Sequence, residues 1–163
     1  MNKQEQKNIK QKREKIINFH RKKLGINGNY KLEIIKGHTY SVNIQGITPI
    51  IKFDEFFYNK LERDEEFRAV ITHELAHRKL ICMKFKTLFC WEFLGRLPII
   101  KFKDNLKKAR LNLEIAADKI AYENQENYSW KDLAFAIEKD ITINESDKKR
   151  RKENLYALAE KEI

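Results

Sequence analysis

Cysteine, proline and glycine are scarce in this chain of 163 residues, which has two cysteines, two prolines and five glycines. Cys82 and Cys90 are too few for a disulfide framework, and their spacing matches no usual zinc-finger ligand set. We therefore expect both to be buried free thiols in a reducing compartment. Internal repeats and low-complexity linkers are also missing from the sequence, so the length suits one domain with a short extension.

Long hydrophobic runs are missing too. The longest mostly apolar run, TLFCWEFLGRLPII at 87–100, contains Glu92 and Arg96 and is shorter than the roughly 18 to 20 residues of a membrane-spanning helix. The first 23 residues have no apolar segment of the kind that a secretory signal requires. We therefore expect a soluble protein without a transmembrane segment, located by default in the cytoplasm.

Acidic residues are outnumbered, because 24 Asp and Glu face 34 Lys and Arg, for a formal charge of +10. A basic surface attracts anionic partners, including nucleic acid, acidic lipids and acidic proteins, but does not choose among them. The basic residues of the first 23 positions are interleaved with Glu5 and Glu14 and follow no recognisable nucleic-acid module. We interpret them as the solvated face of a helix, and a nucleic-acid contact is the less favoured alternative.

The pattern of apolar residues predicts an α+β fold. A small, mainly antiparallel sheet is expected to pack on one central helix, followed by a mostly helical C-terminal half. Residues 1–29 are predicted to form a basic helical extension that docks loosely, and residues 30–163 the main domain. The expected strands are 30–36, 38–44 and 48–53, and the expected helices are 4–24, a short one after Asp54, one starting near Asp64, 100–124, 129–139 and 146–161.

The segment VITHELAHRK, residues 70–79, contains the pattern His73-Glu74-x-x-His77. On an α-helix, positions four apart lie on the same face, so both imidazoles can reach one metal ion. Glu74 lies beside them, near enough to take a proton from a water at that ion. Residue frequencies give a chance expectation of about 0.01 for this pattern, although two helical histidines that merely pack are the alternative. Imidazole ligands suit Zn²⁺.

A catalytic zinc site needs a third protein ligand and an open position for water. His20, in the basic extension, and His38, at the start of a presumed strand, are poor ligand candidates. Glu114 and Asp118 lie four apart in the predicted helix 100–124 and therefore share one face. Glu114 could complete a site with two histidines, and Asp118 could accept the other ring N–H of one of them. An ordinary pair of surface acids is the alternative.

VITHELAH, followed further along the chain by EIAAD at 114–118, resembles the gluzincin metallopeptidases. The resemblance is to the catalytic domains of membrane-linked families such as the HtpX-type proteases and the antibiotic-sensor proteins. It covers residues 30–125 well and the C-terminal third loosely. The membrane helices of those families are absent from this sequence, so the architecture is more similar to that of the soluble minigluzincins. Those proteins use a histidine as third ligand, where this chain offers Glu114.

The resemblance implies a zincin-like fold and one zinc ion, and it implies a role for each matching residue. Asn43 matches a position on the edge strand beside the substrate, where an extended peptide would add through main-chain hydrogen bonds. Arg151 resembles an arginine near the end of the family domain, although the His-Pro that usually precedes it is absent. The other implied roles are His73, His77 and Glu114 as zinc ligands, Glu74 as general base and then acid, and Asp118 as the partner of a ligating histidine.

Taken together, these features predict a zinc-dependent endopeptidase acting on a peptide or protein substrate. Arg151, Tyr122 and His38 are the candidates for a second donor to the developing oxyanion, and a packing role is the alternative for Tyr122. The helices at either end of the chain could cover the cleft, which would make the enzyme latent. The competing hypothesis is a non-catalytic regulatory module of the same fold that binds a protein or nucleic acid through its basic surface. Glu74 favours the enzyme, because such a module needs no base beside the metal.

Overall fold

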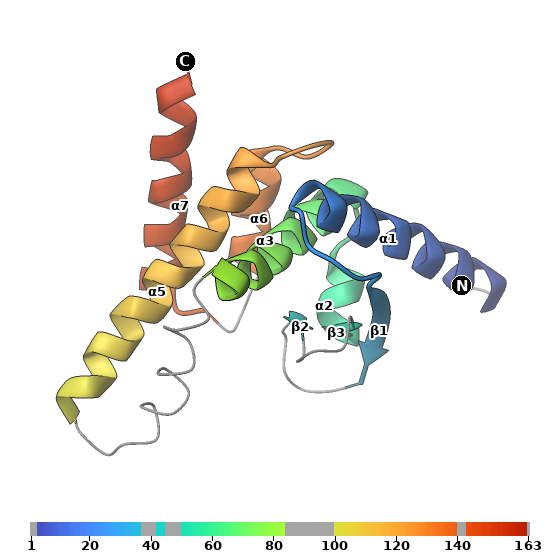
Figure 1. Cartoon of the computed structure of the whole chain (residues 1–163), viewed down its shortest axis with the longest axis horizontal. Helices are drawn as coiled ribbons and strands as arrows, with labels where there is room; N and C mark the ends of the chain where they lie inside the picture. The colour runs from blue at the N-terminus through green and yellow to red at the C-terminus, as the bar shows by residue number, and fades with distance from the viewer. Residues whose placement is uncertain (1–2, 37–41, 45–49, 84–99, 140–142, 163) are drawn as a thin grey trace.

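The computed structural model describes residues 3–36, 42–44, 50–83, 100–139 and 143–162. Helix α3 lies in the middle, with α1 and the sheet on one side and α5, α6 and α7 on the other (Figure 1). The helices lie close to the ranges that the sequence predicts. In chain order the elements are α1 (Lys3–Lys23), β1 (Lys31–Ile35), β2 (Val42–Ile44), β3 (Ile50–Asp54), α2 (Glu55–Lys60), α3 (Asp64–Met83), α5 (Ile100–Glu123), α6 (Trp130–Lys139), α7 (Glu145–Ala159) and the 3-10 turn Glu160–Glu162.

The sheet is mixed, with strand order β1-β3-β2. β1 runs parallel to β3, with Lys31 opposite Ile50, whereas β2 runs antiparallel to β3, with Asn43 opposite Lys52. The prediction of a mainly antiparallel sheet is therefore wrong, because the longer of the two pairings is parallel. The physical reason is that β3 inserts between β1 and β2, and successive short strands do not pair in chain order. Among the described strands, β2 is at the edge next to α3.

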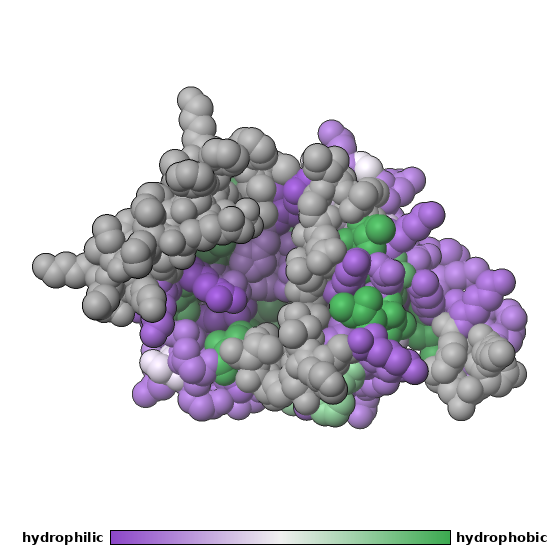
Figure 2. Space-filling model, turned by 90° about the horizontal axis from the view of Figure 1, so that it is seen from below, coloured by the Kyte–Doolittle hydropathy of each residue, from purple (hydrophilic) through white to green (hydrophobic). Residues whose placement is uncertain are grey.

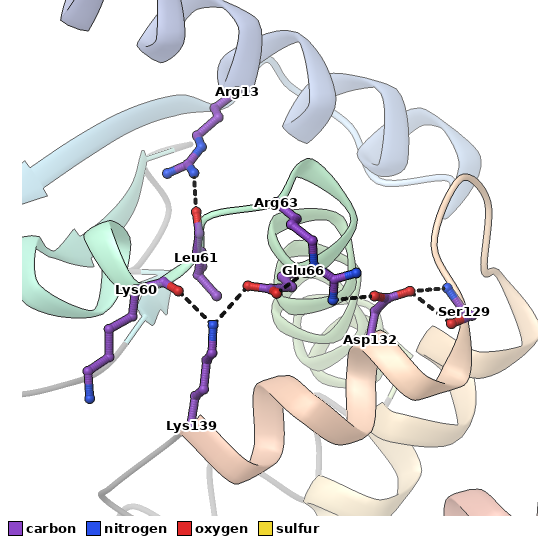
Figure 3. A network of polar contacts seen from close by, with 8 residues as sticks. All are labelled: Arg13, Lys60, Leu61, Arg63, Glu66, Ser129, Asp132 and Lys139. Atoms are coloured by element: carbon purple, nitrogen blue, oxygen red, sulfur yellow. Dashed lines mark hydrogen bonds and ion pairs between the residues drawn. The ribbon is translucent and has the colours of Figure 1, made fainter.

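Local sequence explains how α2 and α3 begin. Asp54 caps α2, since its side chain accepts hydrogen bonds from the backbone N–H groups of Phe56 and Phe57. The first turn of α3 is acidic, which suits the positive end of the helix dipole. At the end of α2, the backbone oxygen of Lys60 accepts a hydrogen bond from Lys139 Nζ of α6 at 2.8 Å (Figure 3). These contacts fix the point from which α3 starts.

A network of ion pairs joins the start of α3 to α6 (Figure 3). Glu66, whose side chain is 3% exposed, lies 2.8 Å from Arg63 Nε and 3.1 Å from Lys139 Nζ. Arg63 also reaches Asp132 Oδ1 at 3.0 Å, and Asp132 accepts hydrogen bonds from the backbone and hydroxyl of Ser129. The buried carboxylate of Glu66 therefore has two cationic partners, as a buried charge requires.

Helix α1 is an integral part of the core. Its apolar residues Ile16 and Ile17, and Leu24 directly after its end, belong to one cluster with side chains of the sheet and α3. The guanidinium of Arg13 lies 4.1 Å from the ring centre of Tyr58 and donates to the backbone oxygen of Leu61 at 2.5 Å (Figure 3). The expectation that this basic helix docks loosely is therefore wrong, because Ile16 and Ile17 are buried in the core, although Phe19 on the same helix is 42% exposed.

One face of the molecule is largely polar where the structure describes it (Figure 2). On the face seen in Figure 2, hydrophilic residues predominate among the described residues and hydrophobic ones occupy a few smaller areas. Among the helices of the described ranges, none combines the length and the hydropathy needed to cross a lipid bilayer. The side chains of Cys82 and Cys90 lie outside the described residues, so the prediction of buried thiols stays a prediction.

One buried histidine connects α1 to α3. His20 is 0% exposed, and its Nδ1 lies 3.0 Å from the hydroxyl oxygen of Thr72. Because that hydroxyl donates its own proton to the backbone oxygen of Arg68 at 2.8 Å, His20 Nδ1 must be the donor. Nε2 then faces Arg68 Nη1 at 3.5 Å as an acceptor. The site therefore fits the neutral imidazole and places a cation against the charged form.

This contact predicts a loss of stability in acid. Burial lowers the pKa of His20 to about 4, and the charges of Arg68 and Lys23 act in the same direction, while Glu126 opposes them. Since the folded pKa lies below the unfolded value of about 6.5, the unfolded chain binds the proton first, and stability falls as the pH drops from about 6.5 towards 4. The expected loss is about 3 kcal/mol at pH 4.

The measurement is denaturant unfolding of the wild type and of His20→Gln between pH 7 and pH 4. Glutamine can still donate to Thr72 but does not titrate, so the variant should lose less of its free energy of unfolding over this range. Parallel stability curves for the two proteins would show that His20 is not the group responsible.

Candidate metal centre

The two histidines of the motif project from the second half of α3. Ile71 and Leu75, on the opposite part of the same turns, are both fully buried in the core. This packing turns the face that carries His73 and His77 towards α5, the helix that contributes Glu114. His73 is buried, and His77 and Glu114 are partly exposed. The site therefore lies between two packed helices and retains access to solvent.

Three side chains place their ligand atoms at the corners of a small triangle. His73 Nε2 lies 3.0 Å from His77 Nε2 and 3.3 Å from Glu114 Oε2, and His77 Nε2 lies 3.4 Å from the same oxygen. Ligands about 2.0 to 2.1 Å from a tetrahedral ion are separated from one another by roughly 3.3 Å. The group formed by His73, His77 and Glu114 could therefore hold a metal ion.

Asp118 lies on the far side of His73. Its Oδ1 is 2.8 Å from His73 Nδ1, the ring nitrogen that faces away from the triangle, although the ring N–H is not aligned with this oxygen for a hydrogen bond. A neutral imidazole with its proton on Nδ1 has a lone pair on Nε2, the nitrogen that faces Glu114 and His77. Asp118 thus favours the tautomer that a metal ligand needs.

Arg151, on α7, pairs with both carboxylates of the site, Asp118 and Glu114. Nε and Nη2 each lie 2.7 Å from one oxygen of Asp118, and Nη1 lies 3.2 Å from Glu114 Oε2. Only 4% of its surface is exposed. The sequence points to Arg151 only through the family resemblance, as a candidate oxyanion donor. No periodicity signals its contact with Asp118, because the two residues are 33 positions apart.

The charges of the site shift its titration. Burial alone would lower the pKa of His73, but the charge of Asp118, with contacts to Asp118 and Glu114, raises it to about 9. Burial alone would raise the pKa of Glu114, yet its contacts with His73 and His77 lower it overall. The pKa of Asp118 is lowered as well, because His73 and Arg151 outweigh its burial. The two carboxylates are therefore kept ionised, whereas His73 without a metal ion is protonated at neutral pH and would have to release this proton on binding one.

Glu74 follows His73 directly on α3 and is half-buried. Within the described part of the chain, no hydrogen bond or ion pair holds its carboxylate. Burial raises the pKa of Glu74, and the charges of His73 and His77 oppose this shift. A carboxylate with a raised pKa next to the ligands is suited to proton transfer.

The remaining predicted residues are divided. Asn43 lies in β2, the edge strand next to α3, and its side chain lies outside what the structure describes. Tyr122 is buried in a hydrophobic cluster with residues of α6 and α7, including Leu133 and Leu155. His38 falls outside the described residues. Of the candidate oxyanion donors, the structure therefore places Arg151 at the site and Tyr122 in a packed cluster.

The function of the site has to be inferred from its own residues, because the comparisons with known proteins found no match. The described residues bring two histidines and one glutamate together, with an aspartate and an arginine behind them. No protein-family model matches this chain, and no curated protein or solved structure matches it significantly.

Proposed function

We propose that this protein is a zinc-dependent endopeptidase with a zincin-like fold. One observation carries the proposal: the two histidines of the HELAH motif and Glu114, from a second helix, form a triangle with sides of 3.0, 3.3 and 3.4 Å. Two imidazoles and one carboxylate are a ligand set of catalytic zinc sites, which use three protein ligands and keep one position open. The gluzincin resemblance of the sequence supports the same conclusion.

The ligand set and its neighbours divide the chemistry between them. A zinc ion held by His73, His77 and Glu114 would supply a Lewis acid that polarises a carbonyl and lowers the pKa of water. Glu74 would take the proton from the attacking water and give it to the leaving amine. Its half-buried position and raised pKa support this role, since a base works best when its pKa approaches the working pH.

The position of β2 supports a protein or peptide as substrate. This strand is at the edge of the described sheet and lies next to the helix that carries the histidines. An extended peptide can add to such an edge through main-chain hydrogen bonds. In that arrangement its backbone would run beside α3, and Asn43, at the centre of β2, would be among the residues nearest to it.

The proposal is tested by removing and restoring the metal. We expect the purified protein to contain about one zinc ion per chain and to release new amino termini from a denatured protein substrate. A strong chelator should abolish this release, and added Zn²⁺ should restore it. Cleavage by the metal-free protein at an undiminished rate would contradict the proposal. A zinc-loaded, folded protein that binds the substrate without cleaving it would favour the non-catalytic module instead.

A further inference from the structure

We infer that Arg151 is a positioning residue of the metal centre, through which the C-terminal helix α7 holds Asp118 and Glu114 in place for metal binding. The inference rests on the metal site of the proposed function. It gives Arg151 a different role from the oxyanion donor that the sequence suggests. It also makes α7 a structural part of the site, which differs from the cleft cover that the sequence suggests.

The guanidinium of Arg151 fixes the orientation of Asp118. Nε and Nη2 face the two oxygens of Asp118 at 2.7 Å each, which is the bidentate arrangement of an arginine and a carboxylate. Such a pair fixes the plane of the carboxylate as well as its position. Asp118 Oδ1 is also the atom that lies 2.8 Å from His73 Nδ1. Asp118 therefore places its negative charge against His73 Nδ1, and Arg151 fixes the position of that charge.

The third guanidinium nitrogen of Arg151, Nη1, contacts Glu114, which is one of the three candidate metal ligands. Nη1 lies 3.2 Å from Glu114 Oε2, the oxygen that faces both histidines. All three guanidinium nitrogens thus have an acidic partner at the site. A side chain held in this way, and 4% exposed, is placed to support the ligands and not to reach a substrate.

Helix α7 can act as a rigid support because it is itself fixed. Leu155, one turn after Arg151, is fully buried in a cluster with Leu133 of α6 and Ala121 of α5. Lys148, one turn before it, is buried and donates to the backbone oxygen of Glu138 at 3.2 Å. The helix is therefore held on both sides of the residue that enters the site.

The test replaces Arg151 with lysine, which keeps the charge and removes the planar fork. A change in affinity then reports orientation, because the positive charge beside the metal is preserved. We expect Arg151→Lys to bind Zn²⁺ and Co²⁺ about tenfold more weakly than the wild type, in competition with a chromophoric chelator. The visible spectrum of bound Co²⁺, which reports coordination geometry, should change as well. Arg150→Lys, at an exposed position on the same helix, is the matched control and should leave both unchanged.

Asp118→Asn and the double variant show whether Arg151 acts through Asp118. Asp118→Asn should also weaken metal binding about tenfold, and adding Arg151→Lys to it should cause little further loss, because the two side chains act as one unit. If Arg151→Lys lowers the unfolding temperature below that of the assay, Asp118→Asn carries the test. A wild type that binds no metal would overturn the proposed function. A metal-binding wild type whose affinity and Co²⁺ spectrum are matched by the folded Arg151→Lys variant would overturn this inference alone.

Discussion

Replacement of Glu74 with glutamine is expected to reduce peptide-bond hydrolysis by roughly 10² to 10⁴-fold, the usual contribution of a general acid or base. The amide has nearly the shape of the carboxylate but cannot take a proton from water at neutral pH. Glu74 is not a corner of the ligand triangle, and His73, His77 and Glu114 are unchanged in this variant. The zinc content should therefore stay at one ion per chain while the rate of amino-terminus release falls.

The matched control is Glu65→Gln, on the same helix. Glu65 is exposed in the first turn of α3, and its substitution changes the net charge by the same amount without approaching the site. It should leave the rate and the metal content unchanged. Wild-type activity in Glu74→Gln would rule out Glu74 as the base. Loss of both activity and zinc would show that Glu74 supports the ligands and would leave its part in proton transfer without support.

The sequence predicts the helices and the ligand set well because both depend on local periodicity. The predicted helix 100–124 matches α5 to within one residue, and the acidic residues at 64–66 predict where α3 begins. The same periodicity puts His73 and His77 on one face, and Glu114 and Asp118 on another. Sequence spacing alone does not show that these two faces meet. The requirement of a catalytic zinc site for a third protein ligand predicts that the two faces meet. The structure places Glu114 3.3 and 3.4 Å from the two histidine nitrogens.

The features that the sequence does not predict depend on contacts between distant segments. Strand order is one: nothing in the short segments indicates that β3 inserts between β1 and β2. The docking of α1 is another, because its buried His20 and Arg13 are polar residues that composition assigns to the surface. Arg151 is the third, since Asp118 lies on α5, and Nη2 of Arg151 is also 3.4 Å from His73 Nε2 on α3. In each case a polar or short segment acquires its role only from the element that it packs against.

Replacement of Glu114 with glutamine is expected to weaken zinc binding by more than about 100-fold. Changes to residues that support ligands cost 10 to 100-fold in affinity, and Glu114 is itself a corner of the triangle. The neutral amide also withdraws the negative charge that lies 3.3 and 3.4 Å from the two histidine nitrogens. Peptidase activity should be lost with the metal, unlike in Glu74→Gln, where the metal is retained.

Glu123→Gln is the control for this change. Glu123 is exposed at the end of α5 and is paired only at the surface, 3.7 Å from Lys119. It should leave zinc affinity at the wild-type value, measured by chelator competition, with circular dichroism confirming that both variants fold. A folded Glu114→Gln protein with wild-type affinity and an unchanged Co²⁺ spectrum would exclude Glu114 as a ligand. The ion would then need a third ligand from elsewhere, and the joint role of α3 and α5 in the site would have to be abandoned.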